Sequence, residues 1–217
     1  MPQLFTSYLC NKDDSIVDSI IKKWKNLNPE FDILYFSDSD VHEFFKKTPY
    51  FSTYEKMKNG VAIADLFRIC YINKFGGYWF DIDIEPFKLE IKLDHKIQLF
   101  DCGYGNISYM LIGGHPNQLL FDTITKKVIS NIENNVPVKK DHIMDITGPR
   151  VLQKLILNKL NIANKDGNFK GTIDPKIFLE NSDFEFCYCL NVLTNVKTTA
   201  YNQLQQKYKK KNYYRYN

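Results

Sequence analysis

The chain has 217 residues, of which 44% are hydrophobic and 25% are charged. This composition is typical of a globular protein and excludes a disordered or fibrous chain, and the length suits one α/β domain of ordinary size. The formal net charge of +4 is too small to indicate nucleic-acid binding by itself, so we expect no nucleic-acid partner. Aromatic residues make up 15% of the chain, which favours strands and a substantial core.

Cysteine usage and the N-terminus indicate the compartment. The five cysteines are odd in number and lie mostly in apolar runs, which is typical of free thiols in a reducing environment. The segment MPQLFTSYLCNKDD has neither the basic start nor the long apolar run of a signal peptide, and no window approaches 18 consecutive apolar residues. We therefore expect a soluble, cytoplasmic protein.

The first third of the chain alternates strand and helix patterns. Residues 2–10 predict a strand, and residues 31–38 predict a second one. Between them, a helix over residues 13–29 is indicated by apolar side chains at helical spacing, with Asp13 or Asp14 as its cap. The apolar positions of this helix are Ile16, Ile20, Trp24 and Leu27. A short helix is expected to open at Ser39 or Asp40.

The next segment contains the strongest helix and the most unusual strand. Residues 59–77 predict a helix closed by a Gly-Gly pair, which suits a left-handed stop. The strand pattern of residues 78–87 follows at once and ends at Pro86.

The remaining elements complete an α/β pattern. Strands are expected at residues 96–102, 107–114 and 184–192. Helices are expected at residues 117–132 and 147–160, the second with Thr147 as cap and Pro149 in its first turn. The alternation predicts a mostly parallel sheet with helices on both faces. We expect a single domain over residues 1–206, followed by a basic, aromatic tail at residues 207–217.

Two aspartates lie one residue apart in the predicted strand 78–87. Alternation places Asp81 and Asp83 on one face with Trp79 and Glu85, while apolar residues occupy the other face. Paired carboxylates repel each other, so they are either solvated at a strand end or compensated by a cation. The carboxyl end of a strand in an open α/β sheet is a common ligand site, where Mg²⁺ or Mn²⁺ binds carboxylates together with a diphosphate.

A second charged pair lies in the preceding helix. Asp65 and Arg68 are three residues apart, on adjacent positions of one helical face, among many apolar residues. The pair is either a surface salt bridge or part of the same site as Asp81 and Asp83.

Together, the residues AIADLFRICYINKFGGYWFDIDIEPF resemble the D-x-D region of glycosyltransferase family 32, the yeast-type α-mannosyltransferase and capsular-sugar transferase group. They are also similar to the glucosylating clostridial toxins and to small transferases of large algal DNA viruses. The best match covers residues 61–87, with weaker agreement over most of the domain. If the chain is virus-encoded, the expected location is the host-cell cytoplasm.

The resemblance implies a GT-A fold, a nucleotide-sugar donor, Mn²⁺ or Mg²⁺ as cofactor, and a role for each motif residue. Asp65 would bond the donor sugar or ribose, and Arg68 the sugar or its phosphate side. Asp81 would contact ribose or sugar and reach the metal through water, and Asp83 would ligate the metal directly. Tyr78 would shape the donor pocket.

The first strand would supply nucleotide contacts, for which we nominate Thr6 and Tyr8. Relatives often supply a late histidine to the metal, but no histidine follows His142 here. The other ligands would be waters, diphosphate oxygens or a carboxylate such as Asp183.

The resemblance implies transfer of a hexose-type sugar from a nucleoside-diphosphate sugar, a UDP-sugar in preference to a GDP-sugar, to a glycan, glycoprotein or other hydroxyl acceptor, with retention of configuration. An inverting enzyme would need a general base, for which Asp145 and Asp183 are candidates. The alternative is a nucleotide-sugar or anionic-polymer binding module without transferase activity, the latter through the tail, which also makes peripheral contacts possible. A phosphohydrolase of the D-x-D-x-T type is disfavoured because Glu85 occupies the threonine position.

Two further motifs have more than one interpretation. Residues 113–115, Gly-Gly-His, either let backbone approach a sugar or form a strand-end turn. Residues 147–150, Thr-Gly-Pro-Arg, either bring a helix N-terminus toward the acceptor or diphosphate, or simply start a helix.

Overall fold

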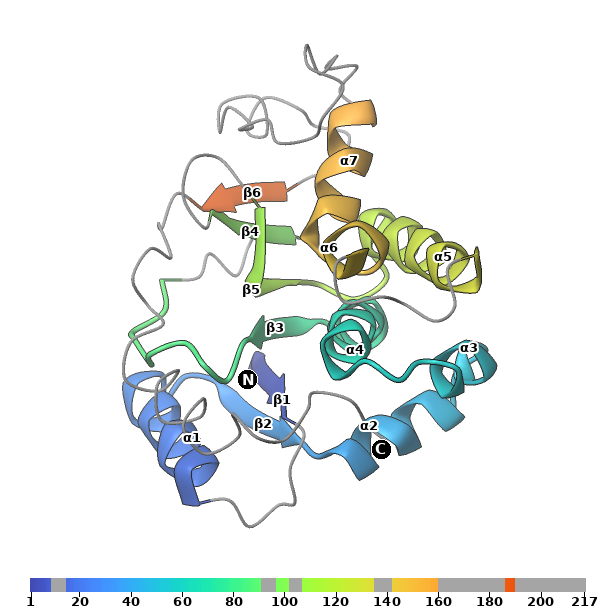
Figure 1. Cartoon of the computed structure of the whole chain (residues 1–217). Coiled ribbons are helices and arrows are strands. Elements are labelled where there is room, and N and C mark those ends of the chain that lie inside the picture. The colour runs from blue at the N-terminus through green and yellow to red at the C-terminus, as the bar shows by residue number, and fades with distance from the viewer. Residues whose placement is uncertain (9–14, 91–96, 102–106, 135–141, 160–185, 190–217) are drawn as a thin grey trace.

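The computed structural model describes residues 1–8, 15–90, 97–101, 107–134, 142–159 and 186–189 (Figure 1). The strands are β1 (Gln3–Ser7), β2 (Asp32–Phe36), β3 (Gly77–Phe80), β4 (Ile97–Asp101), β5 (Ile107–Gly114) and β6 (Phe186–Cys189). The helices are α1 (Ser15–Leu27), α2 (Asp38–Lys46), α3 (Phe51–Glu55), α4 (Gly60–Phe75), α5 (Leu119–Asn134), α6 (Ile143–Ile146) and α7 (Pro149–Lys159).

The strands form one open sheet in the order β2-β1-β3-β5-β4-β6. Strand β1 is parallel to β2 and β3, and β4 is parallel to β6, whereas β5 is antiparallel to both of its neighbours. Every described strand except β5 therefore runs in the same direction. The expected mostly parallel α/β sheet is confirmed, with one reversed strand beside the centre.

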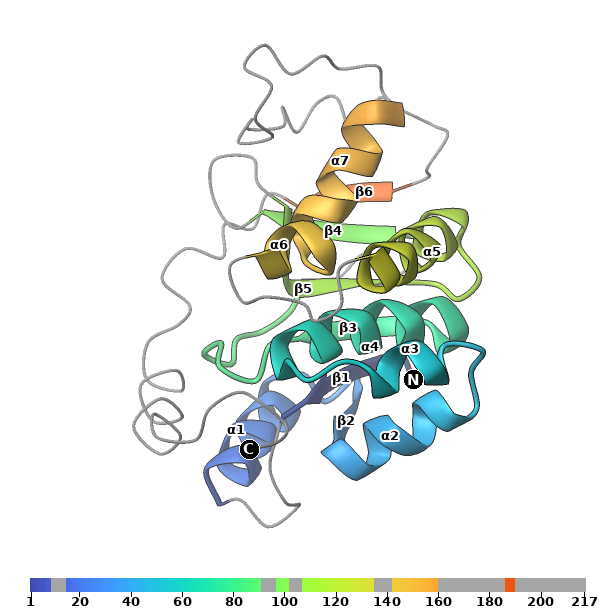
Figure 2. The ribbon, with the colours of Figure 1, turned by 45° about the vertical axis from the view of Figure 1, so that its right-hand side comes forward.

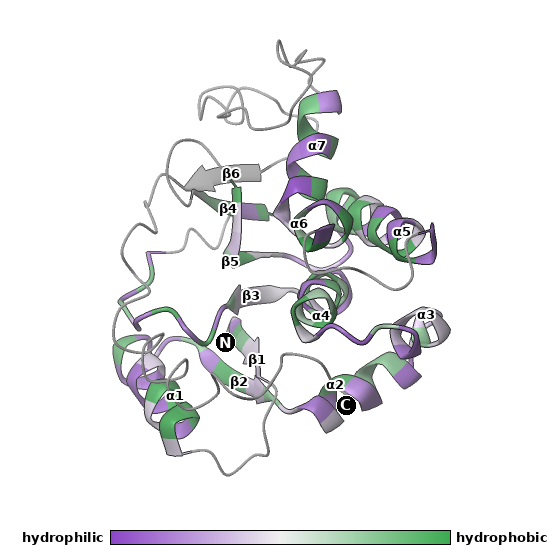
Figure 3. Ribbon diagram, in the orientation of Figure 1, coloured by the Kyte–Doolittle hydropathy of each residue, from purple (hydrophilic) through white to green (hydrophobic). Residues whose placement is uncertain are grey.

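Helices cover both faces of this sheet unequally. Figures 1 and 2 show α1 on one side, while α4 to α7 lie on the other. Strand β3 contributes to both cores, because Phe80 packs with Trp24 of α1 and Trp79 packs with the α4 side. Figure 3 shows apolar and polar stretches on both α1 and α5, as expected for helices with one face on a sheet.

Some helices differ from the sequence predictions. Helix α1 contains the four residues predicted at helical spacing, but its buried residues are Val17, Ile20 and Trp24, and Leu27 at its end is 40% exposed. Helix α2 begins one residue early, at Asp38, because Ser37 and Asp40 form a capping box. Helices α3 and α6 were not predicted, and the proposed caps Asp13 and Asp14 lie outside the described residues.

The acidic segment differs most from its prediction. Strand β3 ends at Phe80, so Asp81 and Asp83 lie in the turn that follows it and the predicted strand over residues 78–87 is wrong beyond that point. The amide of Ile84 donates to the Asp81 carbonyl at 3.1 Å and closes the turn. Ile82 and Ile84 are nevertheless buried in the α1-side core, which explains why the apolar alternation continues past the end of the strand.

Asn28, at the end of α1, anchors the chain beyond this turn. Its Nδ2 donates to the Phe87 carbonyl at 2.9 Å, and its Oδ1 accepts from the Leu89 amide at 2.7 Å. Because Asn28 is fully buried, these bonds fix the segment after Asp83 against the α1 face of the sheet.

The other predicted elements are present where the structure describes them, including β4, β5, α5, α7 and the late strand β6. The tail 207–217 and Asp183 lie outside the described residues.

Cys70 is a free, buried thiol, and burial raises its pKa to about 12. A thiol with such a raised pKa is typical of a structural cysteine and not of a reactive one. Within the described ranges, no helix has the length and apolar character needed to cross a membrane.

Candidate active site

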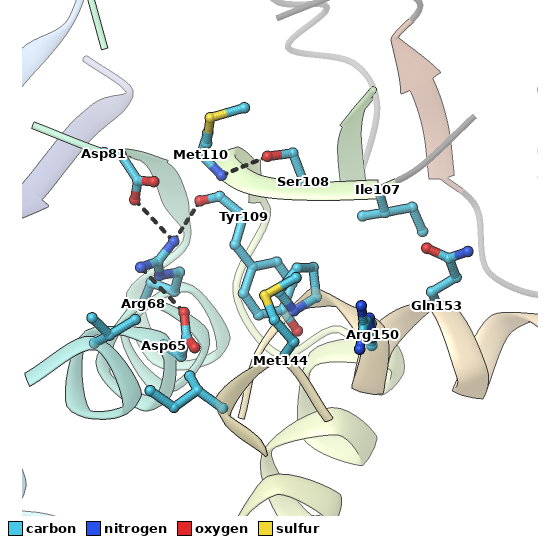
Figure 4. Close-up of a pocket in the computed structure, with 13 residues that line it drawn as sticks. Asp65, Arg68, Asp81, Ile107, Ser108, Tyr109, Met110, Met144, Arg150 and Gln153 are labelled. Atoms are coloured by element: carbon cyan, nitrogen blue, oxygen red, sulfur yellow. Dashed lines mark hydrogen bonds and ion pairs between the residues drawn. The ribbon is translucent and has the colours of Figure 1, made fainter. Parts of the chain in front are cut away.

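A cavity of about 540 Å³ opens where β3 ends (Figure 4). Helix α4 contributes Val61, Asp65 and Arg68 to its lining, and the turn after β3 contributes Asp81. The start of β5, residues 107–110, forms a second side. The corner between α6 and α7 forms the third, with Met144, Arg150 and Gln153 among its lining residues. Figure 4 shows Asp65, Arg68 and Asp81 together, facing Arg150 and Gln153 across the cavity.

Local signals place α4 as the sequence predicts. The Asn59 side chain caps the helix by accepting from the amides of Val61 and Ala62 at 3.0 and 3.2 Å. Gly76 ends the helix with φ of 73°, which a glycine adopts without strain. Asp65 and Arg68 are only 4% and 5% exposed, so the surface salt bridge interpretation is wrong and the pair belongs to the buried wall of the cavity.

The Arg68 guanidinium is almost fully occupied by protein acceptors. Its Nη1 donates to Asp81 Oδ1 at 3.0 Å and to the Tyr109 carbonyl at 2.6 Å. Its Nε donates to the Ala64 carbonyl at 3.2 Å, and its Nη2 lies 3.3 Å from Asp65 Oδ1. A guanidinium has five N–H groups, and the acceptors among the described residues use four of them, which leaves one Nη2 hydrogen for a ligand. Arg68 therefore mainly holds two carboxylates in place.

Asp81 is bonded on one side only. Its Oδ1 accepts from Arg68 and, at 2.8 Å, from Trp79 Nε1. Within the described part of the chain, its Oδ2 has no hydrogen-bond donor, and the side chain is 22% exposed. Asp83, half-buried in the same turn, follows two residues later. Asp81 lines the cavity, whereas Asp83 is not among the residues that line it.

Asp65 is held from both sides in a cluster with a negative excess. Asp65 and Asp81 carry two negative charges against the single positive charge of Arg68. Burial, with a smaller contribution from Asp81, raises the pKa of Asp65 to about 6, although Arg68 and a hydrogen bond from Thr147 oppose the shift. A further cation beside this cluster would be electrostatically favourable.

Thr147 has a role different from the predicted one. It ends α6 rather than capping α7, and its hydroxyl donates to Asp65 Oδ2 at 3.0 Å. Both residues are buried, and they lie 82 positions apart in the chain. Thr147 therefore connects the α6–α7 corner to the buried wall of the cavity.

The other predicted donor-site residues lie away from this cavity. Tyr78 is buried in the α1-side core, where its hydroxyl accepts from Gln98 Nε2 at 3.1 Å. Thr6 is fully buried in β1, and its hydroxyl has no hydrogen-bond partner among the described residues. Tyr8 is half-buried after β1, and its carbonyl accepts from the Tyr35 hydroxyl at 3.2 Å. Asp65, Arg68 and Asp81 line the cavity, whereas Thr6, Tyr8 and Tyr78 do not.

Two weaker candidates have structural explanations. Asp145 accepts from Lys154 at 2.9 Å and Arg150 at 3.0 Å, and these cations lower its pKa, which disfavours it as a general base. A Cβ on Gly113 would lie 2.2 Å from Tyr78 Cδ1, so this glycine is needed for core packing. Within the described ranges, no group of three or more His, Cys, Asp or Glu side chains gathers as a metal site.

Sequence reasoning missed the side of the cavity opposite α4. Tyr109, Met110, Met144 and Gln153 all line it. The first two lie in a predicted strand and Gln153 in a predicted helix, whereas Met144 lies in α6, which was not predicted. Arg150 was noticed within Thr-Gly-Pro-Arg, without a sign that it faces Asp65. The Ser-Tyr pair in an otherwise apolar strand is the one local signal that could have pointed to β5.

Two comparisons show what this chain is similar to, one in sequence and one in fold. The family model described as "Glycosyltransferase sugar-binding region containing DXD motif" matches residues 15–96, which include Asp65, Arg68, Asp81 and Asp83. Among solved structures, the PaToxG glycosyltransferase is similar with a TM-score of 0.56 and 13% identity, over 82% of this chain and 72% of that one. No curated protein matches the sequence.

These findings define the class of protein. The chain carries a glycosyltransferase-like DXD sugar-binding region, and its fold is similar to that of a glycosyltransferase. The resemblance predicted from the acidic motif is thereby confirmed at this level.

Proposed function

We propose that this protein is a metal-dependent glycosyltransferase. It transfers a hexose-type sugar from a nucleoside-diphosphate sugar, a UDP-sugar in preference to a GDP-sugar, to a hydroxyl of a glycan or other acceptor, with retention of configuration. The observation that carries the proposal is the buried Asp65–Arg68–Asp81 cluster, which lies at the carboxyl end of a sheet strand and faces a cavity of about 540 Å³.

The carboxylate oxygens of the turn are ligands of the kind that Mn²⁺ or Mg²⁺ binds. Both cations prefer oxygen ligands, and Asp81 Oδ2 has no protein donor among the described residues. Asp65 and Asp81 carry two negative charges against the single positive charge of Arg68, and a divalent cation would be attracted to this excess. Asp83 would ligate the metal directly and Asp81 through water. When bound, the cation would neutralise the donor diphosphate and stabilise its charge as it leaves.

The sugar would lie against Asp65. Each of its carboxylate oxygens has one protein donor, Arg68 on Oδ1 and Thr147 on Oδ2, so lone pairs remain for a sugar hydroxyl. Arg68 would offer its remaining Nη2 hydrogen, while its other bonds hold the two carboxylates at a fixed separation. Fixed acceptors of this kind position a substrate without reorganisation during the reaction.

The nucleotide would extend toward β1. Tyr8 is half-buried where β1 ends, beside β3 in the sheet, and is the better placed of the two nominated residues to stack on a base. Thr6 and Tyr78 are enclosed in the core, so we propose that they shape this region through packing.

The chemistry requires little from a protein base. In a retaining reaction on one face of the sugar, the bond from the anomeric carbon to the diphosphate breaks and the bond to the acceptor oxygen forms. The acceptor proton passes to the departing diphosphate oxygen. The ion-paired state of Asp145 is consistent with this scheme, because the carboxylate is not set up to accept that proton. The protein would contribute position, charge and exclusion of water.

Donor turnover tests the proposal. The wild type, Asp83→Ala and Asp65→Asn would be incubated with UDP-glucose or GDP-mannose and Mn²⁺, and release of the nucleoside diphosphate measured with and without acceptor sugars. We expect Mn²⁺-dependent release with one donor, reduced about 100-fold or more in both variants. Asp122→Ala removes an exposed carboxylate paired with Lys126 and serves as the control. Binding of a nucleotide sugar without any release would instead indicate a binding module.

A further inference from the structure

The corner between α6 and α7 is hydrogen-bonded to Asp65, on the buried wall of the cavity, through the hydroxyl of Thr147. Thr147 is fully buried, and its Oγ1 lies 3.0 Å from Asp65 Oδ2 and 3.3 Å from the Ile143 carbonyl. A hydroxyl has one hydrogen, and the Asp65 carboxylate is the closer and the charged acceptor. Thr147 lies outside residues 15–96, the region that resembles DXD glycosyltransferases. The contact is therefore made by a part of the chain outside the matched region.

The corner is closely packed around this hydroxyl. The amides of Thr147 and Gly148 both donate to the Ile143 carbonyl at 2.9 Å. A Cβ on Gly148 would lie 2.8 Å from Met144 Cα, closer than real side chains pack, so a glycine is required. Pro149 begins α7 with a fixed φ, which favours the helix start. Such a corner holds the threonine hydroxyl in one place.

The position of this hydroxyl matters because of what else holds Asp65. On the other oxygen, the Arg68 Nη2 contact is 3.3 Å long, and Arg68 is shared with Asp81 and the Tyr109 carbonyl. One contact on one oxygen leaves rotation of the carboxylate open, whereas donors on both oxygens define its plane. Thr147 supplies the second donor.

We propose that Thr147 is a positioning residue, which orients the Asp65 carboxylate for the sugar part of a nucleotide-sugar donor. The inference rests on the proposed function, since it assumes that Asp65 accepts from a sugar hydroxyl. The whole Thr-Gly-Pro-Arg segment then has one purpose. Threonine fixes Asp65, glycine and proline build the corner, and Arg150 lines the facing side of the cavity.

Two substitutions at Thr147 distinguish a role in orienting Asp65 from a role in protein stability alone. Thr147→Val keeps the shape of the side chain and removes the hydroxyl, whereas Thr147→Ser keeps the hydroxyl. Binding of UDP-glucose and of UDP, each with Mn²⁺, would be measured by calorimetry for the full chain. We expect Thr147→Val to weaken UDP-glucose binding about tenfold while UDP binding stays within about twofold, because only the sugar contacts Asp65. Thr147→Ser should stay within about threefold of wild type for both.

Thr125→Val is the matched control, because Thr125 is also fully buried and its hydroxyl donates to the Phe121 carbonyl at 2.8 Å within α5. We expect it to lower the melting temperature without changing the ratio of UDP-glucose to UDP affinity. If Thr147→Val does not fold, Thr147→Cys, with a weaker donor, should give an intermediate loss of UDP-glucose affinity.

The inference is overturned if a folded Thr147→Val or Thr147→Cys binds UDP-glucose as the wild type does, or loses UDP and UDP-glucose affinity equally. A wild type that binds neither ligand with Mn²⁺ overturns the proposed function itself, and the inference with it. The two failures are therefore distinguishable.

Discussion

Arg68 Nη1 donates to Asp81 Oδ1 at 3.0 Å and thereby joins α4 to the turn that follows β3. The same guanidinium contacts Asp65 and stacks over the Trp79 ring, 4.4 Å from its centroid. Because the Arg68 side chain is only 6% exposed, this ion-pair cluster is shielded from solvent on the α4 side. The buried guanidinium of Arg68 thus holds Asp81 of the acidic motif in place.

Replacing Arg68 by an uncharged residue should destabilise the protein strongly. Arg68→Met leaves Asp65 and Asp81 without their shared partner, and breaking a buried ion pair in this way costs about 3–5 kcal/mol. Arg150→Met is the control, because Arg150 pairs with Asp145 but is 42% exposed, so its loss should cost about 1 kcal/mol or less. Urea denaturation of both variants measures the difference. Equal midpoints for the two variants would show that the Arg68 cluster is not a buried ion-pair network.

The pH dependence of stability should report Asp65. Its pKa is about 6 in the folded protein against an ordinary value of 3.8, so between about pH 4 and 6 the folded state binds more protons than the unfolded state. The contribution of Asp65 to the free energy of unfolding therefore falls as pH rises through this window, by about 3 kcal/mol in total. Asp65→Asn lacks this titration.

Denaturation of the wild type and Asp65→Asn from pH 4 to pH 7, in buffer without divalent cations, tests this expectation. The free energy of unfolding of the variant minus that of the wild type should increase with pH. A difference that is constant or decreases across the window would contradict the assigned direction of the pKa shift.

Asn28→Ala should loosen the segment after the acidic turn. The substitution leaves the Phe87 carbonyl and the Leu89 amide without their side-chain partner in a buried place, which costs about 2–3 kcal/mol. Because residues 81–90 lose their anchor, affinity for Mn²⁺ with nucleotide should also fall. Asn134→Ala, whose exposed side chain bonds the Ser130 carbonyl at 2.8 Å, should change stability by about 0.5 kcal/mol or less. An Asn28→Ala variant as stable as Asn134→Ala would refute the anchor.

Gly113→Ala should disturb the core on the α1 face. The added Cβ would meet the Tyr78 ring at 2.2 Å and the Gly77 carbonyl at 2.6 Å, so the strands or the ring must move. Overpacking of this kind costs about 1–3 kcal/mol or more. Thermal unfolding should show a lower melting temperature. An unchanged melting temperature would mean that β3 and β5 are not packed as closely as described.

Local rules account for the parts of the fold that were predicted. Helix α4 could be placed because its signals are near in sequence, with the cap at Asn59 and the left-handed stop at Gly76. The end of β3 could not be placed by alternation, because Ile82 and Ile84 remain buried after the strand has become a turn. An alternating apolar pattern therefore shows that a segment contacts the core, but it does not show that the segment is a strand.

The site was predictable only on its α4 side. Asp65, Arg68, Asp81 and Asp83 lie within one continuous stretch of sequence, where the motif is visible. The contact of Arg68 with Tyr109 spans 41 positions, and that of Asp65 with Thr147 spans 82. Such pairs depend on strand order and on how α6 and α7 return to the sheet, which no local pattern in the sequence determines.

The central claim is a metal and nucleotide site at Asp81 and Asp83, and calorimetry tests it most directly. Binding of UDP and GDP would be measured with and without Mn²⁺ for the wild type and Asp83→Ala, with Asp122→Ala as control. The account predicts that one nucleotide binds only with Mn²⁺ and that Asp83→Ala loses most of this affinity while its melting temperature stays near that of the wild type. Binding of neither nucleotide, or equal binding by Asp83→Ala and the wild type, would contradict it.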